Sequence, residues 1–477
     1  MRVLSVASEI YPLVKTGGLA DVAGALPGAL AAEGVEARSL IPGYPAVLAA
    51  LDSRESVMRL DLFGHPGHLL AARAGQLDLF VIEAPSLYGR AGSIYSGPDG
   101  WDWLDNAFRF AALGRVAAQI GAGEVASFLP DIVHVHDWQA ALAPAYLHYA
   151  SNGRRPGTVF TIHNLAFQGQ FSPTLVGPLG FPPGAYTMDG LEYYGSLGFL
   201  KAGLRFADRI TTVSPSYARE IASPGGGMGF DGLLRTRAAD LSGILNGLDI
   251  SVWNPAADPR LAAAFDVSRL PLRGINKQAV QRRFGLPEDA DALLFGVVTR
   301  LTWQKGMDLL HQAVGALPEG SQLALLGAGE PALQAAFRAA SAAHPAQIGV
   351  RLGYDETLAH CMQGGCDALL VPSRFEPCGL TQLCALRYGA IPVVARVGGL
   401  ADTVIDANPV ALAAGVATGV QFPPDDLTAL QKALAHTATL FHDCPAWSAM
   451  QRNGMATDVG WKAPAAKYAR LYREIAR

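Results

Sequence analysis

Short apolar runs alternate with amphipathic segments along most of the chain. Apolar runs lie near residues 2–7, 131–136, 158–163, 209–214, 293–299, 322–326, 349–352, 367–371 and 391–395. Runs of this length between helical patterns predict buried strands joined by helices. Strands that alternate with helices favour parallel sheets with right-handed crossovers. The pattern therefore predicts an α/β protein built on doubly wound parallel sheets.

The strand runs fall into two series, which the segment 253–259 separates. This segment contains Pro255 and Pro259 and is typical of a crossing between domains. A chain of 477 residues also exceeds what one hydrophobic core usually supports. We predict a first domain over residues 1–250 and a second over residues 251–455.

Composition restricts the partners of the protein. Half of the residues are hydrophobic and only 16% are charged, which supports large cores and argues against disorder. The formal net charge of −4 provides no general basic field, so we expect neither a nucleic-acid nor a membrane partner. The N-terminal apolar run is too short for a signal peptide or a membrane span, so we expect a cytoplasmic protein.

The cysteines predict neither disulfides nor metal. Five cysteines are few and odd in number, which argues against a disulfide framework. Cys361 and Cys366 lack a second pair or clustered histidines that would complete a zinc site, so no metal site is predicted.

The loop 374–381 is the strongest candidate for an active site. It follows the apolar strand near 367–371 and precedes a helical pattern over 380–388. The carboxyl ends of parallel strands bind ligands in open α/β sheets, and a helix N-terminus suits a phosphate. Glu376 would then contact something neutral or positive, such as sugar hydroxyls. The alternative is a surface turn with a solvated Glu376.

Two further segments combine cations with strand ends. Arg300 and Lys305 follow the strand near 293–299, where they could stabilise a leaving diphosphate. Lys15 precedes Gly17 and Gly18 in a turn into a helix, so a backbone approach to a ligand is possible there. The alternative for Arg300 and Lys305 is that they are ordinary surface charges. The alternative for the Lys15 segment is an ordinary turn with a solvated lysine.

Polar residues also follow two strands of the first domain. His136 and Asp137 end the run at 131–136, and His163 and Asn164 end the next. Such ends meet at one edge of a parallel sheet, so these groups form the second half of a predicted site. A structural role for the histidines is the alternative.

With these residues assembled, the chain resembles bacterial glycogen synthases and plant starch synthases over its full length. The matching segments are 15–21, 134–142, 161–169, 213–221, 246–249, 300–309, 374–383 and 398–404. The resemblance implies a GT-B fold, in which two Rossmann-like doubly wound domains face a deep cleft and a C-terminal helix within 456–477 returns to the first domain. It also implies transfer of glucose from ADP-glucose to the non-reducing 4-hydroxyl of glycogen or another α-1,4-glucan, with retention and without metal or cofactor.

The resemblance also implies roles for individual residues. Catalytic roles fall to Glu376, His163, Arg300, Lys305, Asp137 and Asp21. Contacts with the substrates fall to Lys15, Gly17, Gly18, Asn164, Asn246, Tyr354, Cys378, Gly379, Leu380 and Thr381. The chain departs from the family at Cys384, where related enzymes carry a Glu or a Tyr near the ribose.

Three other functions remain as alternatives. One is a retaining transferase that uses UDP-glucose or makes a sucrose- or trehalose-type product. Another is a catalytically silent protein that binds glucan or nucleotide. The third is a dehydrogenase, for which Gly327 and Gly329 provide a weak motif without the acidic residue that should follow about 20 positions later. No oligomeric state is predicted.

Overall fold

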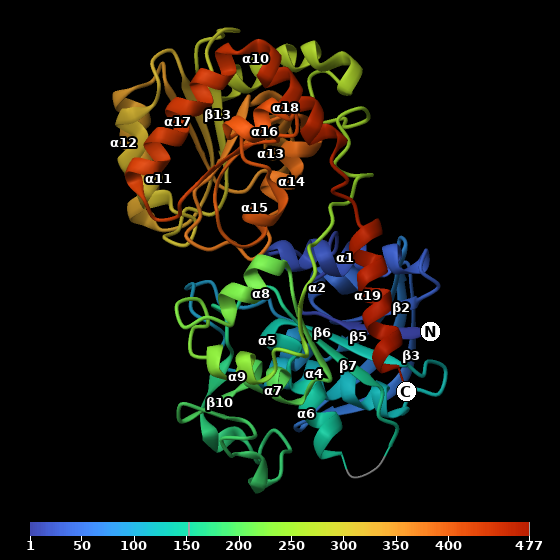
Figure 1. Cartoon of the computed structure of the whole chain (residues 1–477). Coiled ribbons are helices and arrows are strands. Elements are labelled where there is room, and N and C mark those ends of the chain that lie inside the picture. Colours follow the sequence, from blue (N-terminus) through green and yellow to red (C-terminus); the bar gives the residue numbers. More distant parts are fainter. Residues whose placement is uncertain (151–152, 477) are drawn as a thin grey trace. The chain divides into compact units, whose positions relative to one another are not determined.

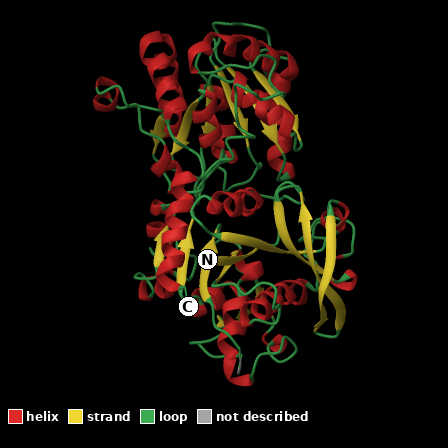
Figure 2. Cartoon of the chain, turned by 90° about the vertical axis from the view of Figure 1, so that its right-hand side faces the viewer, coloured by secondary structure: helices red, strands yellow, loops and turns green. Residues whose placement is uncertain are grey.

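The computed structural model describes residues 1–150 and 153–476. Its contacts divide the chain into two compact units (Figure 1). Unit 1 comprises Met1–Gly247 together with Trp461–Arg477, and unit 2 comprises Leu248–Gly460. In each unit, helices flank a central sheet (Figure 2).

Unit 1 is built on a nine-stranded sheet in the order β12-β11-β7-β6-β1-β2-β5-β4-β3. The strands are β1 (Arg2–Val6), β2 (Glu36–Pro42), β3 (Ser53–Leu62), β4 (His65–Ala74), β5 (Leu77–Glu83), β6 (Ile132–His136), β7 (Gly157–Ile162), β11 (Arg209–Thr212) and β12 (Leu241–Gly243). The seven strands from β12 to β5 are parallel, whereas β3 and β4 form an antiparallel hairpin. Sequence analysis missed this hairpin because β3 is a charged edge strand with a bulge between Ser56 and Met58, so its apolar pattern is weak.

Alternate side chains of each strand point to opposite faces, and a different group of helices covers each face. Val3, Ile132 and Val159 lie under α1 (Gly18–Ala31) and α19 (Lys462–Ile475). The next residues, Leu4 and Val133, belong to the core that also includes residues of α4 (Asn106–Ala122), α5 (Asp137–Ala140), α6 (Leu142–Tyr149) and α7 (Phe199–Phe206). The C-terminal helix therefore belongs to unit 1, where it lies beside α1 (Figure 1).

The remaining elements of unit 1 are short. They are α2 (Pro45–Ala49), α3 (Pro85–Tyr88), α8 (Pro215–Ile221), α9 (Asp231–Thr236), the 3-10 helices η1 (Pro173–Leu175) and η2 (Pro183–Ala185), and a small sheet of β8 (Gln170–Phe171), β9 (Glu192–Tyr193) and β10 (Ser196–Gly198).

Unit 2 is built on a parallel six-stranded sheet in the order β15-β14-β13-β16-β17-β18. Its strands are β13 (Leu294–Val298), β14 (Gln322–Gly327), β15 (Ile348–Leu352), β16 (Ala368–Val371), β17 (Ile391–Ala395) and β18 (Val420–Phe422). Five of these strands were predicted, and β18 was missed because three residues are too few for a pattern.

Helices lie on both faces of the unit 2 sheet. They are α10 (Arg273–Phe284), α11 (Met307–Ala313), α12 (Pro331–Ala343), α13 (Glu356–Gly365), α14 (Thr381–Tyr388), α15 (Gly398–Thr403), α16 (Pro409–Ala413), α17 (Leu427–His442) and α18 (Cys444–Ala456), with the 3-10 helices η3 (Val267–Leu272) and η4 (Val314–Ala316). Over the described residues, no helix combines the length and apolarity needed to cross a membrane.

The strand orders determine where ligands can bind. In unit 2 the chain runs outward from β13 through β14 to β15, and then restarts at β16 and runs the other way. In unit 1 it runs outward from β1 through β2, and β6 and β7 continue on the other side of β1. Each reversal opens a crevice between two loops that diverge from adjacent strands, at the carboxyl ends where ligands bind. These crevices lie after β13 and β16 in unit 2, and after β1 and β6 in unit 1.

Candidate active site

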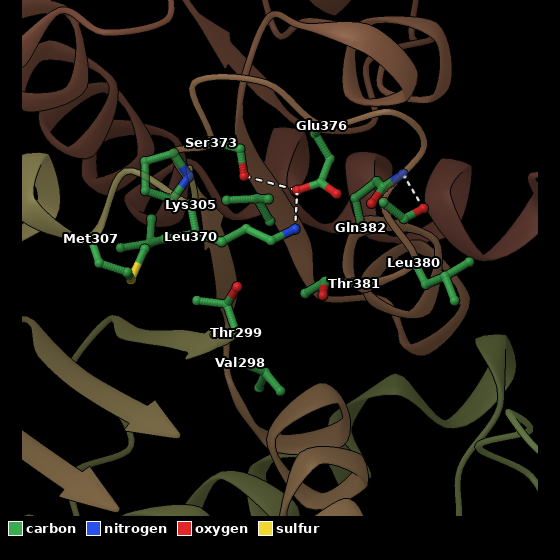
Figure 3. Close-up of a pocket in the computed structure, with 13 residues that line it drawn as sticks. Val298, Thr299, Lys305, Met307, Leu370, Ser373, Glu376, Leu380, Thr381 and Gln382 are labelled. Atoms are coloured by element: carbon green, nitrogen blue, oxygen red, sulfur yellow. Dashed lines mark hydrogen bonds and ion pairs between the residues drawn. The ribbon is translucent and has the colours of Figure 1, made fainter. Parts of the chain in front are cut away.

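A pocket lies at the carboxyl ends of β13 and β16, where the strand order of unit 2 reverses (Figure 3). We call such a reversal a switch point. Residues at or after the ends of β13 and β16, together with the start of α14, line the pocket. The lining residues are Val298, Thr299, Lys305, Met307, Leu370, Val371, Pro372, Ser373, Glu376, Gly379, Leu380, Thr381 and Gln382. The pocket thus brings together five predicted site residues from two segments of the sequence.

Lys305 and Glu376 form an ion pair inside this pocket. Lys305 Nζ lies 2.6 Å from Glu376 Oε2, and Ser373 Oγ donates a hydrogen bond of 2.9 Å to the same oxygen (Figure 3). Glu376 is only 6% exposed, which excludes the alternative of a solvated surface turn. The two donors hold the carboxylate in one orientation beside the pocket.

Glycines allow other segments to approach the loop that carries Glu376. A Cβ atom on Gly398 would lie 2.0 Å from the carbonyl oxygen of Glu376, and one on Gly399 would lie 2.4 Å from Cα of Cys378. Gly398 also has a φ of +42°, a conformation that side chains with a Cβ disfavour. Gly399 N–H donates to the Glu376 carbonyl at 3.1 Å. The start of α15 therefore packs directly against the backbone of the loop that carries Glu376.

The pocket reaches the N-terminal end of α14. Thr381 is the first residue of this helix, and Gly379 precedes it with a φ of +73°. The buried amide of Gln382 donates to the carbonyl oxygens of Cys378 and Gly379 at 2.9 and 3.0 Å. The first N–H groups of a helix lack partners within the helix, so this end can accept an anion.

Arg374 connects the segment after β16 to the segment after β13, but it does not line the pocket. Its guanidinium pairs with both carboxylate oxygens of Asp308 at 2.6 and 2.9 Å and with Asp425 at 2.7 Å. It also lies over the ring of Trp303, with 4.6 Å between the guanidinium carbon and the ring centroid. These contacts give Arg374 a structural role.

Other residues of unit 2 that sequence analysis singled out lie outside the pocket lining. Arg300 is exposed after β13, and Tyr354 is 76% exposed after β15, where its hydroxyl donates to Glu356. Cys384 packs in a buried cluster with Leu248, Leu383, Leu386 and Val459. Cys378 is also buried, and it adjoins the lining through its neighbour Gly379.

In unit 1, Glu9 organises the glycine-bearing turn at the switch point. Its carboxylate accepts hydrogen bonds from the N–H groups of Thr16 and Gly17, from the Thr16 hydroxyl and from the Tyr95 hydroxyl. Burial raises the pKa of Glu9, and the four hydrogen bonds oppose this shift. The Gly17 N–H therefore points to Glu9 in this structure.

Lys15 forms an ion pair of 2.7 Å with Asp21, in the first turn of α1, which begins at Gly18. Both side chains are about a quarter exposed, so the pair is accessible to solvent. Lys15 also lies 5.4 Å from the ring centroid of Tyr11. The structure therefore brings together two of the predicted site residues of this segment.

Asp137 and His163 meet where β6 and β7 end. Asp137 Oδ1 accepts the backbone N–H groups of His163 and Asn164 at 2.7 and 3.4 Å. Asp137 has a φ of +56°, which turns the chain sharply after β6. Burial raises the pKa of its carboxyl to about 7.

Asn246 lies near the end of the N-terminal part of unit 1. Its Oδ1 is buried and has no hydrogen-bond partner among the described residues. A buried acceptor without a partner is costly, which is consistent with a position that a ligand completes.

Sequence reasoning missed three residues that shape these sites, namely Glu9, Ser373 and Gln382. Each is a buried polar residue beside a glycine-bearing or proline-bearing turn, and that combination is the signal that could have found them. In the described part of the chain, no group of three His, Cys, Asp or Glu residues is arranged to hold a metal ion.

Comparison with known proteins identifies the class to which these sites belong. Residues 2–236 match the family described as Starch synthase catalytic domain, and residues 280–439 match the family described as Glycosyl transferases group 1. Both matches fall on the doubly wound sheets described above. The protein is a glycosyltransferase with the two Rossmann-like domains of the GT-B fold.

Full-length relatives identify the family. The chain is 64% identical to a glycogen synthase of Rhodopseudomonas palustris (strain BisB18), with 99% of this chain and 97% of that one covered, and 60% identical to a glycogen synthase of Acidiphilium cryptum (strain JF-5), with coverage of 100% and 99%. It superposes on the catalytic domain of starch synthase IV from Arabidopsis thaliana, bound to ADP and acarbose, with a TM-score of 0.89 at 30% identity, covering 100% and 99% of the two chains. The chain belongs to the glycogen synthase family, and its activity is glycosyl transfer in glycogen synthesis.

Proposed function

We propose that this enzyme transfers glucose from ADP-glucose to the non-reducing 4-hydroxyl of an α-1,4-glucan, with retention of anomeric configuration and without a metal ion. The observation that carries the proposal is the Lys305–Glu376 pair in a pocket at the start of α14. A cation and free helix N–H groups suit a diphosphate, whereas an oriented carboxylate suits sugar hydroxyls. The starch synthase structure bound to ADP and acarbose supports this choice of ligands.

In unit 2, we assign the diphosphate to Lys305 and Arg300. An ammonium group carries three N–H donors, so Lys305 can retain Glu376 while it binds phosphate. Glu376 is assigned to the 3- and 4-hydroxyls of the transferred glucose. The segment from Cys378 to Thr381 is assigned to the phosphate and the sugar through its backbone, and Tyr354 is assigned to the donor.

In unit 1, we assign Lys15, Gly17 and Gly18 to the donor. Their turn adjoins the switch point, where loops bind ligands. Asn246 is a further donor contact, which would give its buried Oδ1 a partner.

We assign His163 and its neighbour Asn164 to the transferred glucose. His163 binds the sugar through its ring, and its carbonyl group lies near the reacting carbon. Asp137 and Asp21 line the sugar and acceptor region. The short hydrogen bond from His163 N–H to Asp137 supports this grouping.

The chemistry follows from the charge that develops. The bond from the anomeric carbon to the β-phosphate oxygen breaks, which leaves negative charge on the phosphate and positive character on the sugar. Lys305 and Arg300 stabilise the leaving group. We propose attack by the acceptor 4-hydroxyl on the face that the phosphate leaves, with the acceptor proton passing to that phosphate. Trapping a covalent glucosyl-enzyme would contradict this route.

The first test is nucleotide release from ADP-glucose or UDP-glucose with added glycogen and EDTA. ADP release that depends on glycogen and resists EDTA is the expected result. Release from UDP-glucose alone would refute the donor assignment, and loss of activity in EDTA would refute metal independence. We also propose a cytoplasmic location, which the five free cysteines support because reducing compartments keep thiols unpaired.

A further inference from the structure

A row of three histidines lies in the interior of unit 1, and the proposed function uses only one of them. His134 and His136 alternate along β6 and so point to the same face of the sheet, and His163 follows β7. The ring centroids of His134 and His136 are 4.1 Å apart, and those of His136 and His163 are 5.2 Å apart. All three side chains are buried.

His163 is held at two points. Its ring Nε2 lies 3.0 Å from His136 Nδ1, within hydrogen-bond distance, and its backbone N–H donates to Asp137. Its other ring nitrogen, Nδ1, forms no hydrogen bond with the described residues. Nδ1 is therefore the ring atom that can contact the transferred glucose.

Burial holds the three rings neutral. It lowers the pKa of His136 to about 3, and it lowers the pKa values of His134 and His163 well below the ordinary value. A neutral imidazole has one N–H donor and one acceptor nitrogen. The hydrogen bond between His136 and His163 therefore couples the tautomers of the two rings.

The coupling extends to Ser5 on β1. Ser5 Oγ lies 3.3 Å from His136 Nε2. If the Ser5 hydroxyl donates to Nε2, His136 Nδ1 carries the proton and His163 keeps its own proton on Nδ1. If His136 Nε2 donates to Ser5 instead, both rings adopt the opposite tautomer and His163 Nδ1 becomes an acceptor.

We propose that His136, supported by Ser5, is a positioning residue that sets the tautomer and the ring orientation of His163 for glucosyl transfer. This inference rests on the proposed contact between His163 and the glucose. His136 itself touches no substrate in this scheme, because its two ring nitrogens are occupied by Ser5 and His163.

His134, the third histidine of the row, does not hydrogen-bond to His163. Its Nδ1 lies 2.7 Å from the Tyr472 hydroxyl on α19, and its Nε2 lies 2.6 Å from Thr161 Oγ1. Both of its nitrogens are therefore engaged away from His163. The bond to Tyr472 fastens the C-terminal helix to the sheet and gives a matched control.

Three substitutions of His136 separate its two hydrogen bonds. His136→Asn keeps a polar group near the position of Nδ1, His136→Gln keeps one near Nε2, and His136→Phe keeps only a ring. We expect kcat to fall about 10–100-fold in His136→Phe and His136→Gln, by analogy with the loss seen when the partner that orients a metal-bound histidine is removed. We expect His136→Asn to retain most of kcat, and KM to change less than kcat in all three.

The control is Tyr472→Phe, which removes a buried hydroxyl from the neighbouring bond. This variant should lose stability and keep kcat. A loss of kcat that followed the melting temperature across Tyr472→Phe and the three His136 variants would show a merely structural role and overturn the proposal.

A double-mutant comparison then tests whether His136 acts through His163. In a His163→Ala background, His136→Phe should cause no further loss of kcat. In the otherwise unchanged protein, the ¹⁵N shifts of the His163 ring should report one tautomer, and His136→Gln should alter them. If His136→Phe fails to fold, the comparison of Asn with Gln and the ¹⁵N shifts decide the question.

The outcomes distinguish the two proposals. If His163→Ala keeps near-normal kcat, the role proposed for His163 is wrong and the inference falls with it. If His163→Ala is inactive while His136→Gln and His136→Phe keep normal kcat, only the inference is wrong. Equal losses for His136→Asn and His136→Gln would also overturn the assignment of Nδ1.

Discussion

The ammonium of Lys305 lies 2.6 Å from the carboxylate of Glu376, although 71 residues separate them in the chain. The two residues follow β13 and β16, which are neighbours in the sheet. In the function proposed above, this one pair supplies both a cation for the phosphate and an acceptor for the sugar hydroxyls.

Lys305→Gln should lower kcat about 10²–10³-fold, the loss typical for one preorganised donor to a developing charge. Gln keeps a donor near Glu376 but removes the positive charge beside a buried carboxylate, so we expect some loss of melting temperature and a far larger loss of kcat. Steady-state kinetics and calorimetry check this. Lys432→Gln, at an exposed position of α17, is the matched control and should change neither quantity. Near-normal turnover in Lys305→Gln would remove the residue from the mechanism.

Gly399→Ala should displace the loop that carries Glu376. The added Cβ would lie 2.4 Å from Cα of Cys378, and the clash involves backbone that cannot rotate away. We expect a loss of about 1–3 kcal/mol in the free energy of unfolding, together with weaker ADP binding by calorimetry. Gly274→Ala is the control, because its Cβ would meet open space on α10 and should stabilise the helix by up to about 1 kcal/mol. Unchanged ADP affinity in Gly399→Ala would mean that α15 does not support the loop.

Asp137→Asn should change how stability depends on pH. The folded pKa of Asp137 is about 7, above the ordinary value of 3.8, so the folded protein holds this proton over the interval in which the unfolded chain has lost it. The contribution of this carboxyl to stability is therefore complete below about pH 4 and is lost as the pH rises to about 7. Asn keeps the acceptor for His163 N–H and tolerates the positive φ.

The measurement is the melting temperature of both proteins from pH 4 to pH 8. The value for the unsubstituted protein minus that for Asp137→Asn should fall through this range and level off above pH 7. If the melting temperatures of the two proteins changed in parallel with pH, burial would not raise the pKa of the Asp137 carboxyl.

Glu9→Gln should loosen the turn that contains Lys15. Glu9 is 3% exposed and accepts four hydrogen bonds through its two carboxylate oxygens. Gln replaces one of these oxygens with an amide nitrogen, which donates and cannot accept, so the bonds to that oxygen are lost. Hydrogen bonds to charged groups contribute about 1.5–3 kcal/mol each, so we expect a clear loss of stability and faster proteolysis within residues 15–17. Glu36→Gln, whose carboxylate pairs with Arg2 at the surface, should change stability by less than about 1 kcal/mol. Equal effects of the two substitutions would contradict the role of Glu9.

The sequence predicted those parts of the site that a single loop carries. The apolar run before residue 374 and the helical pattern after residue 380 placed a loop at a strand end, and the structure places Glu376 and Thr381 in the pocket there. The same reasoning predicted that Arg300 and Lys305 share a role, yet only Lys305 lines the pocket. Both follow the same strand, and only the path of the backbone after β13 distinguishes them.

By itself, the sequence determined the α/β alternation, the two series of strands and the loops at their ends, because hydrophobic periodicity and turn chemistry are local properties. Only the tertiary structure decided which loops meet. The order of strands in each sheet pairs Lys305 with Glu376 and His136 with His163. These contacts join residues that are far apart in the chain or on different elements, and no local pattern encodes such a pairing.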